Sequence, residues 1–295
     1  LEDIIKAGAD IIFCVGPQMM PNSLKVAVEH PEVYILNCSL NAPHPYIRTY
    51  YGRMYEAKFL AGMIAGAVTD NERVAYIADY PIYGMIANIN AFALGVASVN
   101  PRAKVYLAWS KTKDYDRNKF LTENDLHYVS DQDIITPNDA SRYFGLYKLQ
   151  DGQALNLAMP IWNWGVFYEK LLQSVLAGSY KAEGQEQVKA LNYWWGMSAG
   201  VIDLICSKHV PYGVKRLADH LKSDITKGEV VPFFGQIYDQ KGELKNKGEH
   251  EMKPSDIMKM DWLVDNVVGS IPPMSEFVDN AKMVVELKGV EENKL

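Results

Sequence analysis

The feature that most constrains the fold of this chain is a regular alternation of amphipathic helices and short apolar strands. Residues 1–7 indicate a helix, and residues 10–15 indicate a buried strand that ends in the turn Gly16-Pro17. A helix over 21–30 and a strand over 33–38 repeat this unit. Successive helix–strand units predict a parallel sheet, because the connection between parallel strands is usually a helix.

The alternation continues along the chain and is interrupted by Gly, Pro and Asn. Further helices are predicted over 55–68, 83–99, 116–123, 164–176 and 212–227, further strands over 74–78, 105–109, 126–129, 155–160 and 190–195, and a hairpin over 236–238 and 243–245. The length of 295 residues allows about two domains. We therefore expect an α/β chain of two lobes, with ligands bound outside the carboxyl ends of the strands.

Composition and charge exclude several classes of function. Lys and Arg number 30 against 36 Asp and Glu, a formal charge of −6, which disfavours nucleic-acid binding. The longest apolar run, Phe59–Val68, is too short to span a bilayer. The three cysteines have no CxxC spacing and the six histidines are scattered, so we expect no metal site. There is no Walker loop and no GxGxxG after a strand, and we expect no cofactor.

One motif suggests catalysis. Gly196–Gly200 has the pattern GxSxG of a serine nucleophile, with Ser198 at its centre and Asp203 and His209 among the acids and histidines downstream. No His-Gly segment upstream offers an oxyanion hole. A serine hydrolase using Ser198 is therefore the alternative hypothesis, and small residues in a tight turn are the favoured interpretation.

Aromatic residues stand beside polar ones at several predicted strand ends. Trp109 precedes Ser110, Trp162 and Trp164 flank Asn163, and Tyr193–Trp195 precede Gly196. Any one indole is explained by core packing. Several aromatic residues at successive strand ends favour the binding of a planar heterocycle. Such a ligand stacks on an aromatic face, and its edge forms hydrogen bonds with amides or carboxylates.

Five stretches of the sequence resemble the basic membrane protein family, the purine-nucleoside-receptor-like substrate-binding proteins of ABC importers. They are Ala7–Phe13, Tyr51–Gly62, Asn90–Pro101, Asn163–Tyr168, and Met260–Asp265 with Gly269–Pro272. The resemblance implies a type I periplasmic-binding-protein-like fold of two lobes, each a parallel sheet flanked by helices. It assigns residues 1–70 and about 161–205 to the first lobe, and 71–160 and about 206–295 to the second.

The family begins with a strand, a helix and a second strand that have no counterpart here, so we expect the first lobe to lack its N-terminal strands. The resemblance implies a non-enzymatic, extracytoplasmic solute-binding protein, held in the periplasm or by a lipid anchor, although this chain contains no signal segment. Its expected partners are a purine base or nucleoside, clamped between the lobes, and an ABC permease. A sensor domain of a regulator would share the fold, but no helix-turn-helix is visible.

Position by position, the resemblance implies which residues line the ligand site. They are Gly16, Gln18, Met19, Tyr51, Glu56, Trp109, Ser110, Gln132, Asp133, Trp195 and Gly196. Among them, Trp109 and Trp195 are expected to stack on the base, and the Asp133 carboxylate is expected to accept N–H or O–H groups of the ligand.

Overall fold

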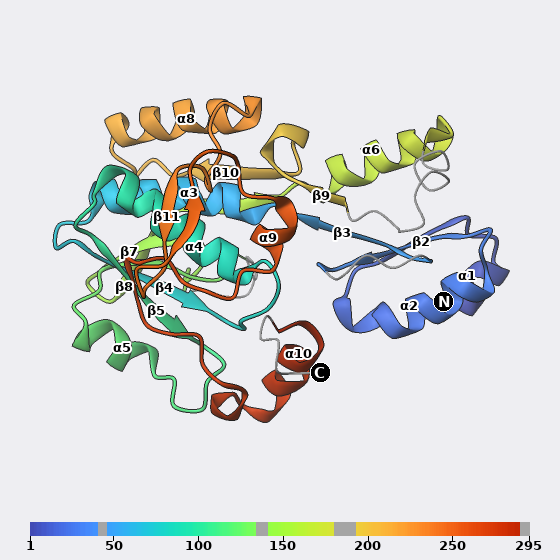
Figure 1. Cartoon of the computed structure of the whole chain (residues 1–295), viewed down its shortest axis with the longest axis horizontal. Helices are drawn as coiled ribbons and strands as arrows, with labels where there is room; N and C mark the ends of the chain where they lie inside the picture. Colours follow the sequence, from blue (N-terminus) through green and yellow to red (C-terminus); the bar gives the residue numbers. More distant parts are fainter. Residues whose placement is uncertain (41–45, 134–140, 180–192, 290–295) are drawn as a thin grey trace. The chain divides into compact units, whose positions relative to one another are not determined.

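The computed structural model describes residues 1–40, 46–133, 141–179 and 193–289 (Figure 1). The chain divides into two compact units, and each is described by itself. The first unit is made of Leu1–Arg53 and Asn163–Gly196, and the second of Met54–Trp162 and Met197–Leu295.

The first unit is built on a parallel sheet in the order β1-β2-β3-β9. Its strands are β1 (Ile11–Cys14), β2 (Tyr34–Cys38), β3 (Arg48–Gly52) and β9 (Tyr193–Trp195), and every neighbouring pair is parallel. Its helices are α1 (Glu2–Lys6), the 3-10 turn η1 (Pro17–Met19), α2 (Met20–Glu29) and α6 (Trp164–Leu176).

The two faces of this sheet carry different cores. Ile12 and Cys14 of β1 pack with Val26 and Ala27 of α2 in an aliphatic cluster. The opposite face is aromatic: Tyr50 stacks on Phe167 of α6 with ring centroids 4.7 Å apart. Successive side chains of a strand point to opposite faces of the sheet, and this separates the aliphatic residues from the aromatic ones.

The second unit contains a seven-stranded sheet in the order β10-β8-β7-β6-β4-β5-β13. The strands are β4 (Arg73–Ala78), β5 (Lys104–Trp109), β6 (Tyr128–Ser130), β7 (Leu146–Gln150), β8 (Gln153–Trp162), β10 (Ile202–Cys206) and β13 (Val267–Val268). The pairs from β6 through β4 and β5 to β13 are parallel, whereas β6–β7, β7–β8 and β8–β10 are antiparallel. The predicted parallel sheet is therefore present with an added antiparallel half.

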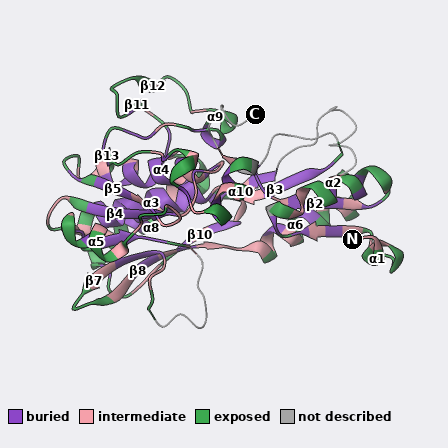
Figure 2. Ribbon diagram, turned by 90° about the horizontal axis from the view of Figure 1, so that it is seen from below, coloured by how far each residue is buried: buried purple, intermediate pink, exposed green. Residues whose placement is uncertain are grey.

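Two buried helices cover one face of this sheet. They are α3 (Met54–Val68) and α4 (Met85–Val99), and Figure 2 shows them and the strands β4 and β5 as largely buried. Glycines let the helices approach closely: a Cβ added at Gly62 would lie 2.0 Å from the Phe92 carbonyl oxygen, and one at Gly95 2.0 Å from that of Phe59. The motif GxxxG at Gly62–Gly66 of α3 therefore serves the packing of α3 on α4.

The opposite face packs on α5 (Arg117–Glu123), whose Leu121 joins Ala75, Ile77, Val129 and Tyr147 in one cluster. The remaining elements are the 3-10 turns η2 (Met197–Ala199) and η3 (Met274–Glu276), α8 (Tyr212–Lys227), the hairpin β11 (Gln236–Tyr238) with β12 (Leu244–Lys247), α9 (Pro254–Met258) and α10 (Asp279–Lys288). No helix in the described part of the chain is both long and apolar enough to cross a membrane.

The mixed α/β fold with parallel sheets flanked by helices confirms the predicted fold class. The division into units differs from the predicted lobe ranges in two segments, 54–70 and 197–205, because α3 packs on α4 and β10 pairs with β8. As functional lobes, the predicted ranges stay a prediction.

Candidate functional site

In the second unit, three neighbouring parallel strands end beside one another. β6, β4 and β5 are adjacent in the sheet, so the segments that follow them, Asp131–Asp133, Asp79 and Ser110, share one edge. Carboxyl edges of parallel strands are where α/β folds place ligands. We call these segments, with the side chains that contact them, the carboxyl-edge cluster.

On the side of α3, the cluster contains a buried ion pair. Lys58 is 1% exposed, and its Nζ lies 2.6 Å from Asp133 Oδ1. The same ammonium donates to Ser130 Oγ at 3.2 Å and lies 5.0 Å from the centre of the Tyr76 ring. Burial raises the pKa of Asp133, and the positive charge of Lys58 opposes the rise.

On the side of α5, Arg117 holds the preceding carboxylate. Its guanidinium lies 2.7 Å from Asp131 Oδ2, which also accepts the Tyr147 hydroxyl at 3.1 Å. Asp131 Oδ1 accepts the backbone N–H of Gln132 at 2.8 Å. Asp131 and Asp133 are therefore anchored on opposite sides of the strand end, one by Arg117 and the other by Lys58.

The end of β5 supplies Trp109 and Ser110. The Ser110 hydroxyl donates to the Asp79 carboxylate, which follows β4. The Trp109 indole is 6% exposed and donates its Nε1–H to the Ser270 carbonyl at 2.8 Å. Trp109 also lines a pocket of about 400 Å³ together with Tyr115. The structure thus brings Trp109, Ser110, Gln132 and Asp133 together at one edge.

In the first unit, Gly16, Trp195 and Gly196 follow or end parallel strands of one sheet. The Gly16 carbonyl accepts the buried Asn37 side-chain amide at 3.0 Å. Trp195 is partly exposed, and its ring centre lies 5.1 Å from that of Phe167. Gly196 is buried. These three predicted residues lie at the carboxyl edge of that sheet.

The other predicted residues of the first unit have varied surroundings. Gln18 is exposed in η1, and Met19 packs against the aliphatic cluster. Tyr51 of β3 is partly buried and makes an edge contact with Trp164, with ring centres 6.5 Å apart. Their roles as ligand contacts stay a prediction.

Glu56 has a clear structural contact within the second unit. It is 7% exposed in the first turn of α3, and its Oε2 accepts the backbone N–H of Met197 at 2.6 Å. This bond fixes η2 against α3. One carboxylate oxygen thus contributes to local structure, whatever Glu56 contributes to ligand binding.

Ser198 lies in η2, which follows β9 and precedes β10, and Gly200 ends the turn with φ +75°. A nucleophile elbow leads from a strand into a helix, whereas this segment leads from strand to strand. Ser198 is exposed, and none of the described histidines hydrogen-bonds to its hydroxyl. The GxSxG pattern is here a turn of small residues.

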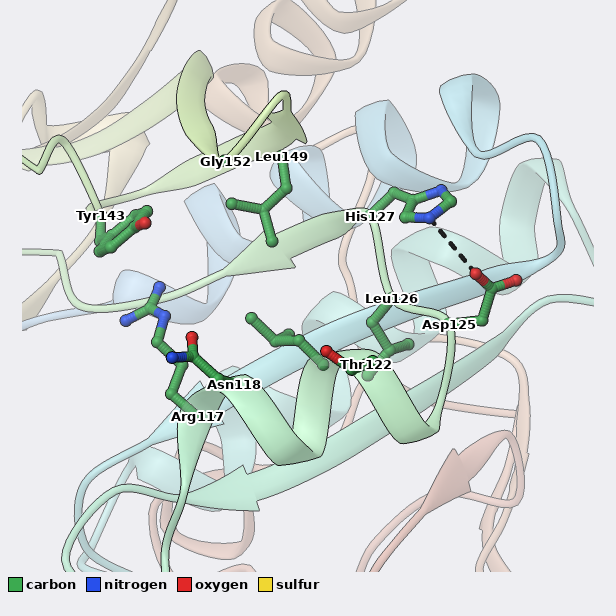
Figure 3. A pocket seen from close by; sticks show the side chains of 10 residues that line it. Arg117, Asn118, Thr122, Asp125, Leu126, His127, Tyr143, Leu149 and Gly152 are labelled. Carbon is green, nitrogen blue, oxygen red and sulfur yellow. Dashed lines mark ion pairs between the residues drawn. The ribbon is translucent and has the colours of Figure 1, made fainter.

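Two other pockets are lined by none of the predicted residues. One of about 430 Å³ lies beside α5, as Figure 3 shows, with Leu126 and Leu149 among its apolar lining and Arg117 at its wall. The guanidinium of Arg117 lies 4.0 Å from the centre of the Tyr143 ring. The other, of about 500 Å³, lies at the β11–β12 hairpin and is lined by Lys245 and Trp262. In the described ranges no three His, Cys, Asp or Glu side chains are grouped to hold a metal ion.

Sequence reasoning missed the residues that hold the predicted ones in place: Asp79, Asp131, Arg117, Tyr147 and Lys58. Lys58 stands between Ala57 and Phe59 in a helix whose other charged residue is Glu56, and a lysine within such an apolar stretch is the sequence signal for a buried cation.

The family model described as "ABC transporter substrate-binding protein PnrA-like" (Bmp) matches residues 1–143. This match confirms the resemblance that the sequence motifs predict.

Two curated relatives are similar to the chain. A purine-binding protein from Brucella abortus is 26% identical over 285 residues, which cover 92% of this chain and 79% of that protein. A protein from Haloferax volcanii, TsgA13, whose name gives a glucose-binding role in an ABC transporter as provisional, is 29% identical over 213 residues, covering 68% of this chain and 52% of that one.

Solved structures share the fold. A solute-binding protein of an ABC transporter from Conexibacter woesei has a TM-score of 0.53 at 17% identity, covering 78% of this chain and 81% of that one. A transcriptional activator of the comK gene from Bacillus halodurans has a TM-score of 0.60 at 14% identity, covering 78% and 83%. The family match and the relatives support a solute-binding role, and none of them supports a hydrolase.

Proposed function

We propose that this chain is the extracytoplasmic substrate-binding component of an ABC importer, that it binds a purine base or nucleoside, and that it catalyses no reaction. The family description and the purine-binding relative support this proposal. The partner would be the permease of that importer, and the protein would deliver its solute unchanged.

The carboxyl-edge cluster is the observation that carries the proposal. It presents a largely buried carboxylate, Asp133, at the sheet edge that also carries the hydroxyl of Ser110 and the indole of Trp109. A purine offers N–H donors and ring-nitrogen acceptors around a flat apolar face. A carboxylate in a desolvated site accepts such donors strongly, with each charged hydrogen bond contributing about 1.5–3 kcal/mol.

The arrangement of charges favours binding over catalysis. Both carboxylates after β6 are held by cations, Asp131 by Arg117 and Asp133 by Lys58, so neither is poised as a free general base. The exposed Ser198 has no activating histidine among the described residues. We propose that the remaining residues named in the sequence analysis, from Gly16 to Gly196, supply further contacts to the solute.

Titration calorimetry tests the proposal. The protein is first unfolded and refolded to remove any co-purified solute, and is then titrated with adenosine, guanosine, inosine, adenine, guanine and D-glucose. We expect binding of at least one purine and none of glucose. Asp133→Asn should weaken purine binding by about 10- to 100-fold, because the charged acceptor is lost. Ser198→Ala is the matched control and should bind as the parent does.

Glucose is the rival ligand, because a relative carries a name for that sugar. Binding of D-glucose with no binding of any purine would contradict the proposed solute while leaving the solute-binding role intact. Native mass spectrometry of the protein as purified provides an independent check, since a retained base or nucleoside would be identified by its mass.

A further inference from the structure

Tyr115 belongs to the second unit, and no sequence pattern assigns it a role. It lies in the segment between β5 and α5, directly before Asp116, whose side chain accepts the Lys119 N–H and begins α5. Its ring packs partly buried against the cluster of Ala75, Ile77 and Leu121. The side chain is therefore held in place by apolar contacts at the carboxyl end of the sheet.

The hydroxyl of Tyr115 is buried and has no hydrogen-bond partner in the described part of the chain. Leaving a buried hydroxyl unpaired costs about 1–3 kcal/mol, and native proteins contain few such groups. A buried hydroxyl that is left unpaired therefore requires a specific physical reason. A ligand, a bound water molecule or a strained contact are the physical possibilities.

The surroundings of the hydroxyl are those of the carboxyl-edge cluster. The charges that act on it belong to Arg117, Asp131, Asp79 and Asp116. Asp131 already receives hydrogen bonds from Arg117 and Tyr147, and Asp79 receives one from Ser110. Burial raises the pKa of Tyr115 to about 12, so the hydroxyl keeps its proton at neutral pH and remains a donor.

We propose that the Tyr115 hydroxyl donates a hydrogen bond to a ring nitrogen or carbonyl oxygen of the bound solute, which makes Tyr115 a specificity-determining residue of the binding site. The proposal rests on the proposed function. It assigns complementary roles within the cluster: the carboxylate of Asp133 accepts hydrogen bonds from the N–H groups of the solute, and the hydroxyl of Tyr115 donates a hydrogen bond to an acceptor atom of the solute.

This arrangement explains why the hydroxyl is retained in an unpaired state. A site built to hydrogen-bond a ligand atom rejects an analogue that lacks this atom, because the buried polar group of the protein is then left unpaired. The apolar packing of the ring fixes the position of the hydroxyl before binding, so little conformational entropy is lost when the bond forms.

The substitution Tyr115→Phe removes the hydroxyl alone. The melting temperature of the ligand-free protein should stay the same or rise, because an unpaired buried hydroxyl has been removed. Affinity for the purine that the parent binds should fall about 3- to 10-fold, measured by calorimetry. Tyr147→Phe is the matched control: it removes a hydroxyl that donates to Asp131, so its ligand-free melting temperature should fall.

Deaza analogues identify the ligand atom. Adenosine is compared with its 1-deaza, 3-deaza and 7-deaza forms, and inosine extends the series to a carbonyl oxygen, each against the parent and Tyr115→Phe. If Tyr115 donates to a ring nitrogen, the analogue lacking this nitrogen should bind the parent more weakly, and the difference should disappear in Tyr115→Phe. If Tyr115→Phe weakens the binding of inosine and of no other probe, the Tyr115 hydroxyl donates to the carbonyl oxygen of inosine.

Two results would overturn the proposal. Unchanged affinity of Tyr115→Phe for every probe would mean that a water molecule satisfies the hydroxyl. A lowered melting temperature of the ligand-free variant would mean that the hydroxyl has a partner within the protein. If the parent binds D-glucose and no purine, the purine assignment fails, and the affinity of Tyr115→Phe for glucose decides the role of Tyr115 by the same criteria.

Discussion

Lys58 of α3 and Asp133, which follows β6, form a buried ion pair across 75 residues of sequence, with Nζ 2.6 Å from Oδ1. The pair joins the helix face of the sheet to the strand end at which the candidate site lies. Lys58 also donates to Ser130 Oγ and to the carbonyl oxygen of Asp131, so one ammonium holds the whole end of β6. This position makes Lys58 a structural support for Asp133.

Removing Lys58 alone should destabilise the protein strongly. In Lys58→Met the Asp133 carboxylate stays buried without its cation, and breaking a buried pair costs about 3–5 kcal/mol. The double variant Lys58→Met with Asp133→Asn leaves no unpaired charge and should recover more than half of this loss. Urea unfolding of the parent, both single variants and the double variant measures the coupling. A double variant with the summed loss of the single variants would contradict the assignment.

The same variant should show a characteristic pH dependence. Burial raises the pKa of Asp133, and Lys58 opposes the rise, so its removal should raise this pKa further. A carboxyl group whose pKa is higher in the folded protein than in the unfolded chain stabilises the fold at pH values below its pKa in the unfolded chain. This stabilisation is lost as the pH rises through its pKa in the folded protein. The defect of Lys58→Met should therefore shrink in acid and be largest at neutral pH, which urea unfolding at several pH values would measure.

A second prediction concerns the contact between α3 and α4. Gly62→Ala would place a Cβ 2.0 Å from the Phe92 carbonyl oxygen, so the helices must move apart. We expect a loss of about 1–3 kcal/mol in the free energy of unfolding. Gly213→Ala in α8 is the matched control, since a Cβ there meets no atom within 4 Å, and it should be neutral or slightly stabilising. Equal effects of the two substitutions would contradict the close packing.

Elements with a clear apolar period and end signals could be predicted from the sequence. The bounds of α6 and α8 match the predicted ranges 164–176 and 212–227, and α3 and α4 differ from theirs by a few residues at most. The strands β3, β7 and β10 were not predicted. Their residues mix polar and apolar types without clear alternation, and two of them join antiparallel pairs that a helix–strand rhythm does not indicate.

The candidate site was predictable only in part, for a similar reason. Trp109 and Ser110 stand at a strand end, which local patterns reveal, whereas Asp133 was predicted from the family resemblance. Their supports come from distant parts of the chain: Asp79 bonds Ser110 across 31 residues, and Lys58 reaches Asp133 from another element. Which charge neutralises which carboxylate depends on strand order and helix placement, and the sequence pattern alone carries neither.

A third prediction concerns His30 in the first unit. Its Nδ1 lies 3.1 Å from Glu32 Oε1 and its Nε2 lies 3.2 Å from Glu2 Oε2. The hydrogen bond to Glu32 is the main cause that raises the pKa of His30 in the folded protein, and Glu2 adds to it. Stability from this contact is fully present below the unfolded pKa of about 6.5 and is lost as pH rises through the folded value.

His30→Gln should therefore lower the melting temperature near pH 5.5 and have a smaller effect near pH 8.5. The two carboxylates are exposed and His30 is partly exposed, so the difference should be small and should diminish with added salt. His220→Gln on the exposed face of α8 is the control and should show no such trend. A larger effect of His30→Gln at the alkaline end would contradict the role of this contact.

The last prediction compares binding and hydrolysis at Ser198. A hydrolase would need a serine activated by a histidine, and its hydroxyl would react with a fluorophosphonate probe. Here Ser198 is exposed in a turn between two strands, with no histidine bonded to it in the described part of the chain. We expect no labelling of the parent above that of Ser198→Ala, and a stability change within about 0.5 kcal/mol, as for other exposed positions. Because labelling needs no knowledge of the substrate, parent-specific labelling would restore the hydrolase hypothesis even if purine binding were also observed.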